Sequence, residues 1–257
     1  DGLMPLLLEF VDFVRRKTND QLTVGVNDGM LGGPFNVAFR LRGLARFMRD
    51  MYETPDLANK LLKICTETVI RFTKVLKEHV GDDMDANTGI DLVWIPKGKG
   101  GIAIADDEAV IFSPRLYREF AVPYNSRILD SFGGGFIHCC GDATHNFDAI
   151  LRISSLKAYH EDFMGKTATF KGVKEKVKRK IPIIGASVCP ELKHISWFKN
   201  AVETARTDKA SLLQLSCLED CVTTPEGGYI IRKVDASTSL QQAKKIARFI
   251  KKHGRYY

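Results

Sequence analysis

The chain has 257 residues, of which 44% are hydrophobic and 27% are charged, and its formal net charge is +7. This length suffices for one large hydrophobic core, so we expect a single domain over residues 1–257. No apolar run reaches the roughly 18 residues of a membrane span, and nothing resembles a secretion signal, so the sequence predicts a cytoplasmic protein without membrane contact. Six cysteines are too few for a disulfide scaffold, which leaves reduced thiols, a metal site or core packing.

Much of the positive charge lies in two runs, residues 171–180 and residues 244–257. Solvated helix faces account for most such runs, and the alternative is a surface that binds an acidic protein or a polycarboxylate. Nucleic acid is not an expected partner, because neither run interleaves its basic residues with stacking aromatic side chains in a recognisable binding module.

Helical and strand-like patterns alternate along the chain. Apolar residues recur at the three- and four-residue spacing of amphipathic helices in residues 7–17, 39–53, 56–80, 115–132 and 240–253. Pro55 with Asp56, and Ser113 with Pro114, have the form of helix starts. Short apolar or β-branched runs, typical of buried strands, cover residues 22–27, 91–96 or 101–106, 135–140, 156–161, 181–188 and 211–217. This alternation predicts repeated β–α units around a parallel sheet.

Such units build either a doubly wound open sheet or a (β/α)8 barrel. Neither of the glycine-rich phosphate-binding patterns, G-x-G-x-x-G and G-x-x-x-x-G-K-[ST], opens a helix in this sequence, so the commonest reason to prefer a nucleotide-binding open sheet is missing. We therefore expect an α/β protein of the (β/α)8 TIM-barrel class. In either architecture, the chemistry should lie at the carboxyl ends of the strands.

The stretch GFIHCC ends one of the predicted strands and presents two metal-binding side chains. Side chains at i and i+2 of a strand point the same way, so His138 and Cys140 should face one side and Cys139 the other. An imidazole and a thiolate side by side suit zinc. Alone, the pair is a weak signal, because a histidine or cysteine on a strand is more often a core residue than a ligand.

Glu161 and Cys217 each close another predicted strand, so in a barrel they would reach the same mouth as His138 and Cys140. Together the four side chains would complete a tetrahedral zinc site. The alternatives are an exposed carboxylate for Glu161 and a small buried apolar residue for Cys217.

Asp106 and Asp107 stand at the end of the predicted strand 101–106. At the mouth of a barrel, at least one of these carboxylates would bind substrate or take part in proton transfer, which makes both candidate catalytic residues. The alternative is that both cap the turn that follows the strand.

Several stretches resemble successive landmarks of the uroporphyrinogen decarboxylase superfamily, and within it the zinc-dependent corrinoid methyltransferases. The resemblance runs from about residue 20 to about residue 226 and is carried by LGGPFNVAFRLRG, DLANKLLK, FSPRLYREFAVPY, IHCCGD, GASVCP and TTP. It implies a TIM barrel that lacks its N-terminal portion.

In the methyltransferase branch, zinc is held by an H-x-C pair, a cysteine further along and commonly a carboxylate between them. His138, Cys140, Glu161 and Cys217 match that pattern. The resemblance implies that zinc activates a thiol similar to coenzyme M, and that the thiolate takes a methyl group from a corrinoid on a separate protein. The expected cofactors are thus Zn2+ and a corrinoid, and the expected partners are a corrinoid-binding protein and a small methyl acceptor or donor.

Three alternatives stay open. The methyl group could pass the other way, from a methoxylated or methylated substrate to the corrinoid. The chain could be a metal-free porphyrinogen decarboxylase, but the arginine-rich segment of that branch has no counterpart here, and Cys217 stands where the decarboxylases carry a histidine. The non-enzymatic alternative is a barrel that binds an anionic ligand or a partner protein without turnover.

Overall fold

The structure, a computed structural model, describes residues 2–22, 24, 32–86, 97–162, 167–178, 180–188, 211–216, 221–223, 229–231 and 248. The chain divides into two compact units, Asp1–Cys139 with His145–Ala158, and Cys140–Thr144 with Tyr159–Tyr257. The single domain over residues 1–257 stays a prediction. The predicted strands 22–27 and 91–96 and the predicted helix 240–253 lie almost entirely outside the described residues.

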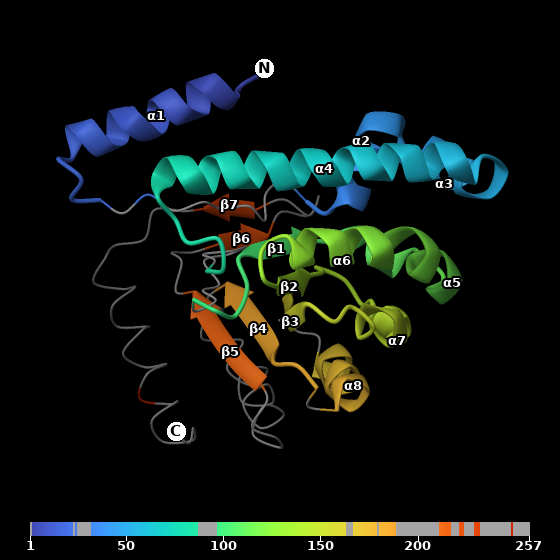
Figure 1. The fold of residues 1–257 in the computed structure, drawn as a ribbon. Coiled ribbons are helices and arrows are strands. Elements are labelled where there is room, and N and C mark those ends of the chain that lie inside the picture. Colours follow the sequence, from blue (N-terminus) through green and yellow to red (C-terminus); the bar gives the residue numbers. More distant parts are fainter. Residues whose placement is uncertain are drawn as a thin grey trace. The chain divides into compact units, whose positions relative to one another are not determined.

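Four helices make up the N-terminal half of the first unit: α1 (Met4–Lys17), α2 (Pro34–Arg42), α3 (Leu44–Glu53) and α4 (Pro55–Val80). Helices α2 and α3 both pack against the long helix α4 (Figure 1). Helix α4 begins at Pro55, as predicted, since a proline at the first helical position gives up an N–H that has no partner there.

The single helix predicted over residues 39–53 is wrong, because Gly43 separates α2 from α3. Its φ of 82° is strained for any residue with a side chain, and it lets the chain change direction. Across this junction the Arg42 guanidinium binds both carboxylate oxygens of Asp50, with Nε–Oδ2 at 2.7 Å and Nη2–Oδ1 at 3.2 Å. The hydrogen bond from Arg42 holds the pKa of Asp50 below its usual value.

Aromatic rings form much of the core of the first unit. The Phe35 ring contacts Phe47 and Phe112 edge to face, with centroids 5.1 Å and 4.3 Å apart, and all three side chains are buried. These rings join α2 and α3 to the segment that follows the first strand. Aromatic pairs in this geometry add to the stabilisation that burial alone provides.

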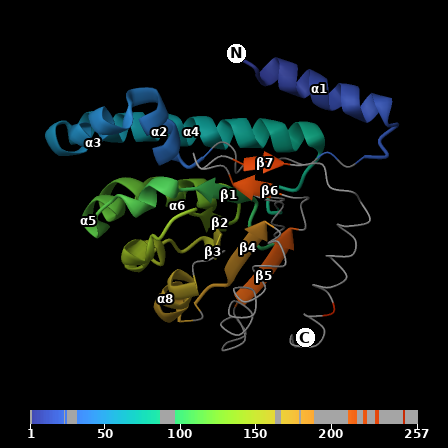
Figure 2. The same ribbon diagram turned by 180° about the vertical axis from the view of Figure 1, so that it is seen from behind.

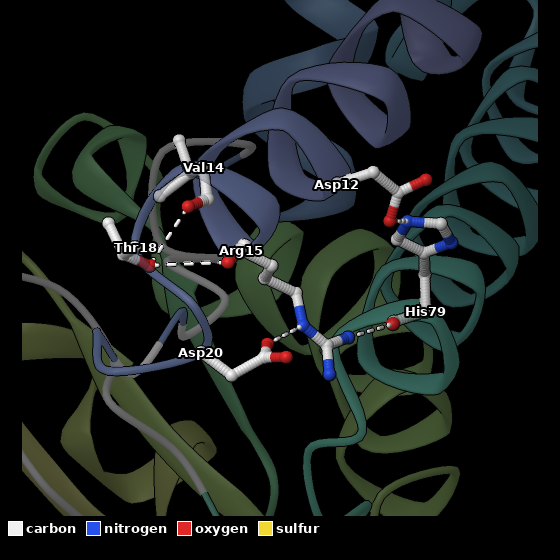
Figure 3. Close-up of polar contacts among 6 residues, drawn as sticks. All are labelled: Asp12, Val14, Arg15, Thr18, Asp20 and His79. Atoms are coloured by element: carbon white, nitrogen blue, oxygen red, sulfur yellow. Dashed lines mark hydrogen bonds and ion pairs between the residues drawn. The ribbon is translucent and has the colours of Figure 1, made fainter.

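Helix α1 is attached to the end of α4 mainly by polar contacts (Figure 3). His79 Nε2 lies 2.9 Å from Asp12 Oδ1, and Arg15 donates to the His79 carbonyl oxygen at 3.4 Å and to Asp20 Oδ1 at 2.8 Å. Val11 is the buried apolar residue of this helix. Several large apolar side chains of this helix and its N-cap are exposed: Leu3, Leu6, Leu7, Phe10 and Phe13.

Five strands form one sheet in the order β1-β2-β3-β4-β5: β1 (Ile102–Ala105), β2 (Gly135–His138), β3 (Leu156–Asp162), β4 (Ile183–Val188) and β5 (Ser211–Ser216). The pairs β1–β2, β3–β4 and β4–β5 are parallel, and Figure 2 shows β4 and β5 side by side. A separate antiparallel pair, which the sequence did not predict, joins β6 (Cys221–Thr223) to β7 (Tyr229–Ile231). The predicted α/β class with a parallel sheet is confirmed, whereas the described strands do not form a closed ring of eight, so the TIM barrel stays a prediction.

Between β1 and β2 the chain passes through η3 (Asp107–Val110), α5 (Pro114–Leu116), a π-helical turn η4 (Tyr117–Ala121) and α6 (Val122–Asp130). Ser113 caps this run, since its Oγ accepts a hydrogen bond from Leu116 N–H at 3.4 Å. Pro123 has no N–H to donate to the residue four positions earlier, which accounts for the wider turn directly before it. The continuous helix predicted over residues 115–132 is therefore interrupted.

After β2 come η5 (Thr144–Asn146) and α7 (Phe147–Ile150), and after β3 comes α8 (Thr167–Val177). Helix α8 buries Phe170, Val173 and Val177 and exposes most of its basic residues, as the sequence predicts for a solvated face. Lys174 is buried instead, with Nζ 5.7 Å from the centre of the Phe170 ring. Within the described part of the chain, no helix combines the length and the apolar character that crossing a bilayer requires.

Candidate metal centre

The carboxyl ends of β1 and β2 lie together because the two strands are parallel and in register. Ala105 pairs with His138, and the Asp106 N–H donates to the His138 carbonyl oxygen at 2.8 Å. The strands can approach this closely because Gly135 has no side chain, and a Cβ there would overlap the Ile102 carbonyl group. Residues that follow β1 are thus held beside the last residue of β2.

A possible metal-binding group lies at this point. His138 Nε2 is 3.8 Å from Asp107 Oδ1; the histidine side chain is 5% exposed and the aspartate side chain 42%. Cys140 follows His138 after a single residue and is exposed. One ligand atom from each of Asp107, His138 and Cys140 lies within 4.8 Å of the others.

The donor set fits zinc. Zinc takes nitrogen, sulfur and oxygen ligands at about 2.0–2.3 Å, which puts the ligand atoms of a tetrahedron about 3.5 Å apart. The ligand atoms of His138, Cys140 and Asp107 lie within 4.8 Å of one another, and the His138–Asp107 pair is 3.8 Å apart, so side-chain rotations would have to bring them closer to hold one ion. Cys139 is fully buried, with Sγ 4.0 Å from the Asp107 carbonyl oxygen, as expected if it faces away from its neighbours.

Two of the predicted ligands are not part of this group. Glu161 is buried in β3 of the second unit, where the Tyr159 hydroxyl donates to Glu161 Oε2 at 3.3 Å. Tyr159 and Glu161 are two residues apart on the strand and share a face. Cys217 lies outside the described residues. The roles of both as zinc ligands stay predictions.

Asp106 is 1% exposed and its carboxylate is held by two side chains from the following helical segment. Tyr117 Oη and Asn125 Nδ2 donate to Asp106 Oδ2 at 2.5 Å and 2.9 Å. Burial raises the pKa of Asp106 to about 6, although these two hydrogen bonds lower it, and the charge of Asp107 raises it further. Burial also keeps the pKa of Tyr117 well above its usual value, so the hydroxyl remains a donor.

Glu108 adds a third acidic side chain to this end of β1, and sequence reasoning missed it. Burial raises the pKa of Glu108 to about 7, and the charges of Asp106 and Asp107 act in the same direction, while Arg40 opposes them. Sequence reasoning also missed Tyr117 and Asn125. The catalytic roles predicted for Asp106 and Asp107 stay predictions. The structure shows that Asp106 accepts hydrogen bonds from neighbouring side chains and that Asp107 lies beside His138.

Replacing Asp106 with asparagine should remove a pH dependence of stability. The folded protein holds the Asp106 proton up to about pH 6, whereas an unfolded aspartate has a pKa of about 3.9. Because the folded protein binds this proton more tightly than the unfolded chain does, protonated Asp106 stabilises the fold at pH values below the pKa of the unfolded residue. This contribution is lost as the pH rises from about 4 to about 6. We expect the unfolding free energy of metal-free wild-type protein to fall by about 3 kcal/mol relative to Asp106→Asn across this window.

The measurement is urea denaturation at a series of pH values on both metal-free proteins. Identical pH profiles would show that Asp106 titrates normally in the folded protein.

The N-terminal helices and the fold are each similar to known proteins. Residues 1–82 match the model of the family described as Uroporphyrinogen decarboxylase (URO-D). That match covers α1 to α4 and ends before the candidate metal residues. A search of curated proteins finds no match.

Among solved structures, the chain is similar to a methyltransferase from Methanosarcina mazei, with a TM-score of 0.63 and 19% sequence identity. The similarity covers 96% of this chain. At this level of sequence identity the similarity is one of fold. The chain spans 65% of the methyltransferase's length, which is just under two thirds. The family match thus concerns the N-terminal helices, and the structural similarity concerns the fold.

Proposed function

We propose that the chain is a zinc-dependent methyltransferase that moves a methyl group between a corrinoid protein and a small acceptor, most simply a thiol. The observation that carries this proposal is the group of Asp107, His138 and Cys140 at the carboxyl ends of β1 and β2. The fold shared with a methyltransferase supports the same conclusion. The ligands would be His138 and Cys140, with Cys217 and a carboxylate completing the set.

Each described residue has a distinct task in such a site. When bound, zinc lowers the pKa of a coordinated thiol, so that the thiolate is available at neutral pH. His138 is buried, and its carbonyl oxygen accepts a hydrogen bond from the Asp106 N–H, which holds the backbone that carries the imidazole. Cys140 is exposed, which leaves the site open toward a substrate.

The proposed partner is a corrinoid-binding protein. An acidic surface on that partner would suit the exposed lysines of α8 and the residues just after it: Lys171, Lys176, Lys178 and Lys180. The alternative direction is transfer of a methyl group from a methoxylated or methylated substrate to the corrinoid of the partner protein.

A porphyrinogen decarboxylase is the second candidate, because residues 1–82 match the URO-D family. Decarboxylation in that branch needs no metal. Conversion of a porphyrinogen by protein stripped of zinc would therefore favour this candidate over the methyltransferase.

The direct test is methyl transfer from methylcobalamin to 2-mercaptoethanesulfonate, with the thioether product measured by mass spectrometry. We expect turnover by zinc-loaded protein and none after chelation. Cys140→Ala should lower the rate by at least about 100-fold, since removing a ligand costs more than removing a residue that supports one.

Cys139→Ala is the matched control, because it removes the adjacent thiol, which is buried. Equal rates for Cys140→Ala and wild type, or a well-folded protein that takes up no zinc, would rule out the proposed mechanism.

A further inference from the structure

Arginine is concentrated on one exposed part of the first unit. Helices α2 and α3 and the segment from α5 to η4 contain six arginines, three acidic residues and no lysine, although lysines outnumber arginines in the chain as a whole. We propose that these elements form a docking face for an acidic protein. The arginine face consists of Arg40, Arg46, Arg49, Tyr52, Arg115 and Arg118. The identity of its partner as the corrinoid protein rests on the proposed function, whereas the docking of an acidic protein does not.

The elements that carry the arginine face lie next to one another. The guanidinium carbon of Arg115 is 5.9 Å from the centre of the Tyr52 ring, which joins α5 to α3. Both ribbon views show α3 and α5 at the same end of the first unit (Figures 1 and 2). Helices α2 and α3 are joined in turn by the ion pair of Arg42 with Asp50. The arginines therefore belong to one surface although they come from separate parts of the sequence.

Buried aromatic packing holds this surface from beneath. Phe35 of α2 contacts both Phe47 of α3 and Phe112, which directly precedes the cap of α5. These three rings are at most 2% exposed. A partner that binds here does not have to order the helices first, and avoiding that entropic cost favours affinity.

The positive charge of the face is only partly neutralised by its own acidic side chains. Asp50 is bound by Arg42, and Glu119 lies 3.4 Å from Arg115. Three further exposed arginines form no hydrogen bond or ion pair in the described part of the chain: Arg46, Arg49 and Arg118. A guanidinium group binds a carboxylate through two parallel hydrogen bonds, so these side chains suit aspartate and glutamate on a partner.

The other exposed side chains favour a protein over a nucleic acid. Leu41 is 71% exposed and Tyr52 is 61% exposed beside the arginines. Protein interfaces are enriched in tyrosine and arginine and depleted in lysine, with apolar contacts at their centre. Single-stranded nucleic acids instead stack successive bases on several aromatic side chains. The composition of the arginine face thus matches an acidic protein surface.

The arginine face borders the candidate metal centre. Helix α2 contacts η3, which begins at Asp107, and the charge of Arg40 acts on Glu108. Asp107 Oδ1 in turn lies 3.8 Å from His138 Nε2. A protein bound to the arginine face is held beside these side chains, where a partner that carries the methyl group has to bind if the proposed function holds.

The experiment measures binding of fluorescein-labelled poly-L-glutamate by anisotropy at low and at high ionic strength. We expect wild type to bind at low ionic strength and to release the probe as salt screens the charges. The double variant Arg46→Glu with Arg49→Glu should bind at least about 10-fold more weakly. Amide hydrogen exchange should slow in α3 and α5 of wild type when the probe is bound.

Arg71→Glu with Lys74→Glu is the matched control. It changes the net charge equally, at the same three-residue spacing and at exposed positions of α4, so it should bind the probe nearly as wild type does. Circular dichroism and the melting temperature check that both variants fold. Should the first pair unfold α3, Arg40→Glu with Arg118→Glu tests the same face from α2 and η4.

Equal losses in the arginine-face and control variants would show that binding follows net charge alone, and this result would overturn the docking face. A wild-type protein that does not bind poly-L-glutamate would overturn it as well. Tighter binding of oligouridylate than of poly-L-glutamate through the same arginines would overturn the choice of a protein partner.

The outcome is separable from that of the proposed function, because poly-L-glutamate binding requires neither zinc nor methyl transfer. Binding that depends on the arginine face in a protein without zinc or turnover would retain the docking face and remove the methyltransferase. Methyl transfer from methylcobalamin by a protein that does not bind the probe would do the reverse.

Discussion

His138→Ala should abolish stoichiometric zinc binding. The imidazole is nearly buried at the end of β2, where Asp107 Oδ1 lies 3.8 Å away and Cys140 follows after one residue. Alanine leaves a carboxylate and a thiolate without the nitrogen ligand between them, and neither side chain can replace it. Since residues that merely orient a ligand contribute 10–100-fold to metal affinity, the loss of the ligand itself should exceed about 100-fold.

The measurement is metal content by elemental analysis, followed by a competition titration with a zinc chelator. His79→Ala is the control, because it removes a histidine that contacts Asp12 and the end of α1 instead of the metal group. The proposed site is wrong if His138→Ala retains one tightly held zinc per chain, or if both variants lose zinc equally.

Lys77→Met should destabilise the first unit by about 3 kcal/mol. The Lys77 side chain is 0% exposed, and its ammonium donates to Asp82 Oδ2 at 3.1 Å and to the carbonyl oxygens of Asp83 and Ala86 at 3.2 Å and 2.8 Å. Methionine is similar in length and apolar, but it cannot donate these hydrogen bonds. The two carbonyl groups then lose their donor, and Asp82 loses its counter-charge.

Urea denaturation followed by helical circular dichroism measures this loss. Lys74→Met provides the comparison, because Lys74 is exposed on the same helix and its replacement should change the unfolding free energy by less than about 0.5 kcal/mol. Equal stabilities for the two variants would mean that the ammonium of Lys77 is hydrated in the folded protein.

The strands could be predicted because their signal is local. The runs at 101–106, 135–140, 156–161, 181–188 and 211–217 are short, apolar and bounded by polar or glycine-containing stretches, and each coincides with a strand. Buried parallel strands have this composition wherever they pair. The one deviation concerns β2, which ends at His138, so the cysteines lie just beyond the strand.

The helix breaks could not be predicted from periodicity. Gly43 and Pro123 each interrupt an apolar pattern that continues on both sides, and the period alone does not show whether such a residue is tolerated or ends the helix. Lys77 illustrates the same limit. In an amphipathic pattern a lysine is assigned to the solvent face, whereas here the turn after α4 folds back and surrounds its ammonium with oxygen atoms.

Part of the candidate metal site could be predicted from the sequence. The alternation of side chains along an extended chain was enough to group His138 with Cys140 and to set the buried Cys139 apart. The roles of His138 and Cys140 as metal ligands stay predictions. The proximity of Asp107 depends on the pairing of β1 with β2, which no local pattern reveals. Tyr117 and Asn125 depend in addition on the π-helical turn between them.

The register between β1 and β2 also bears on how the site assembles during folding. Asp107, His138 and Cys140 all belong to a single crossover between neighbouring strands, so no distant part of the chain has to arrive before these ligands meet. Closing one loop of this kind costs little more entropy than closing a shorter one, because the cost grows only with the logarithm of loop length. The ligands can therefore meet as soon as β1 and β2 pair.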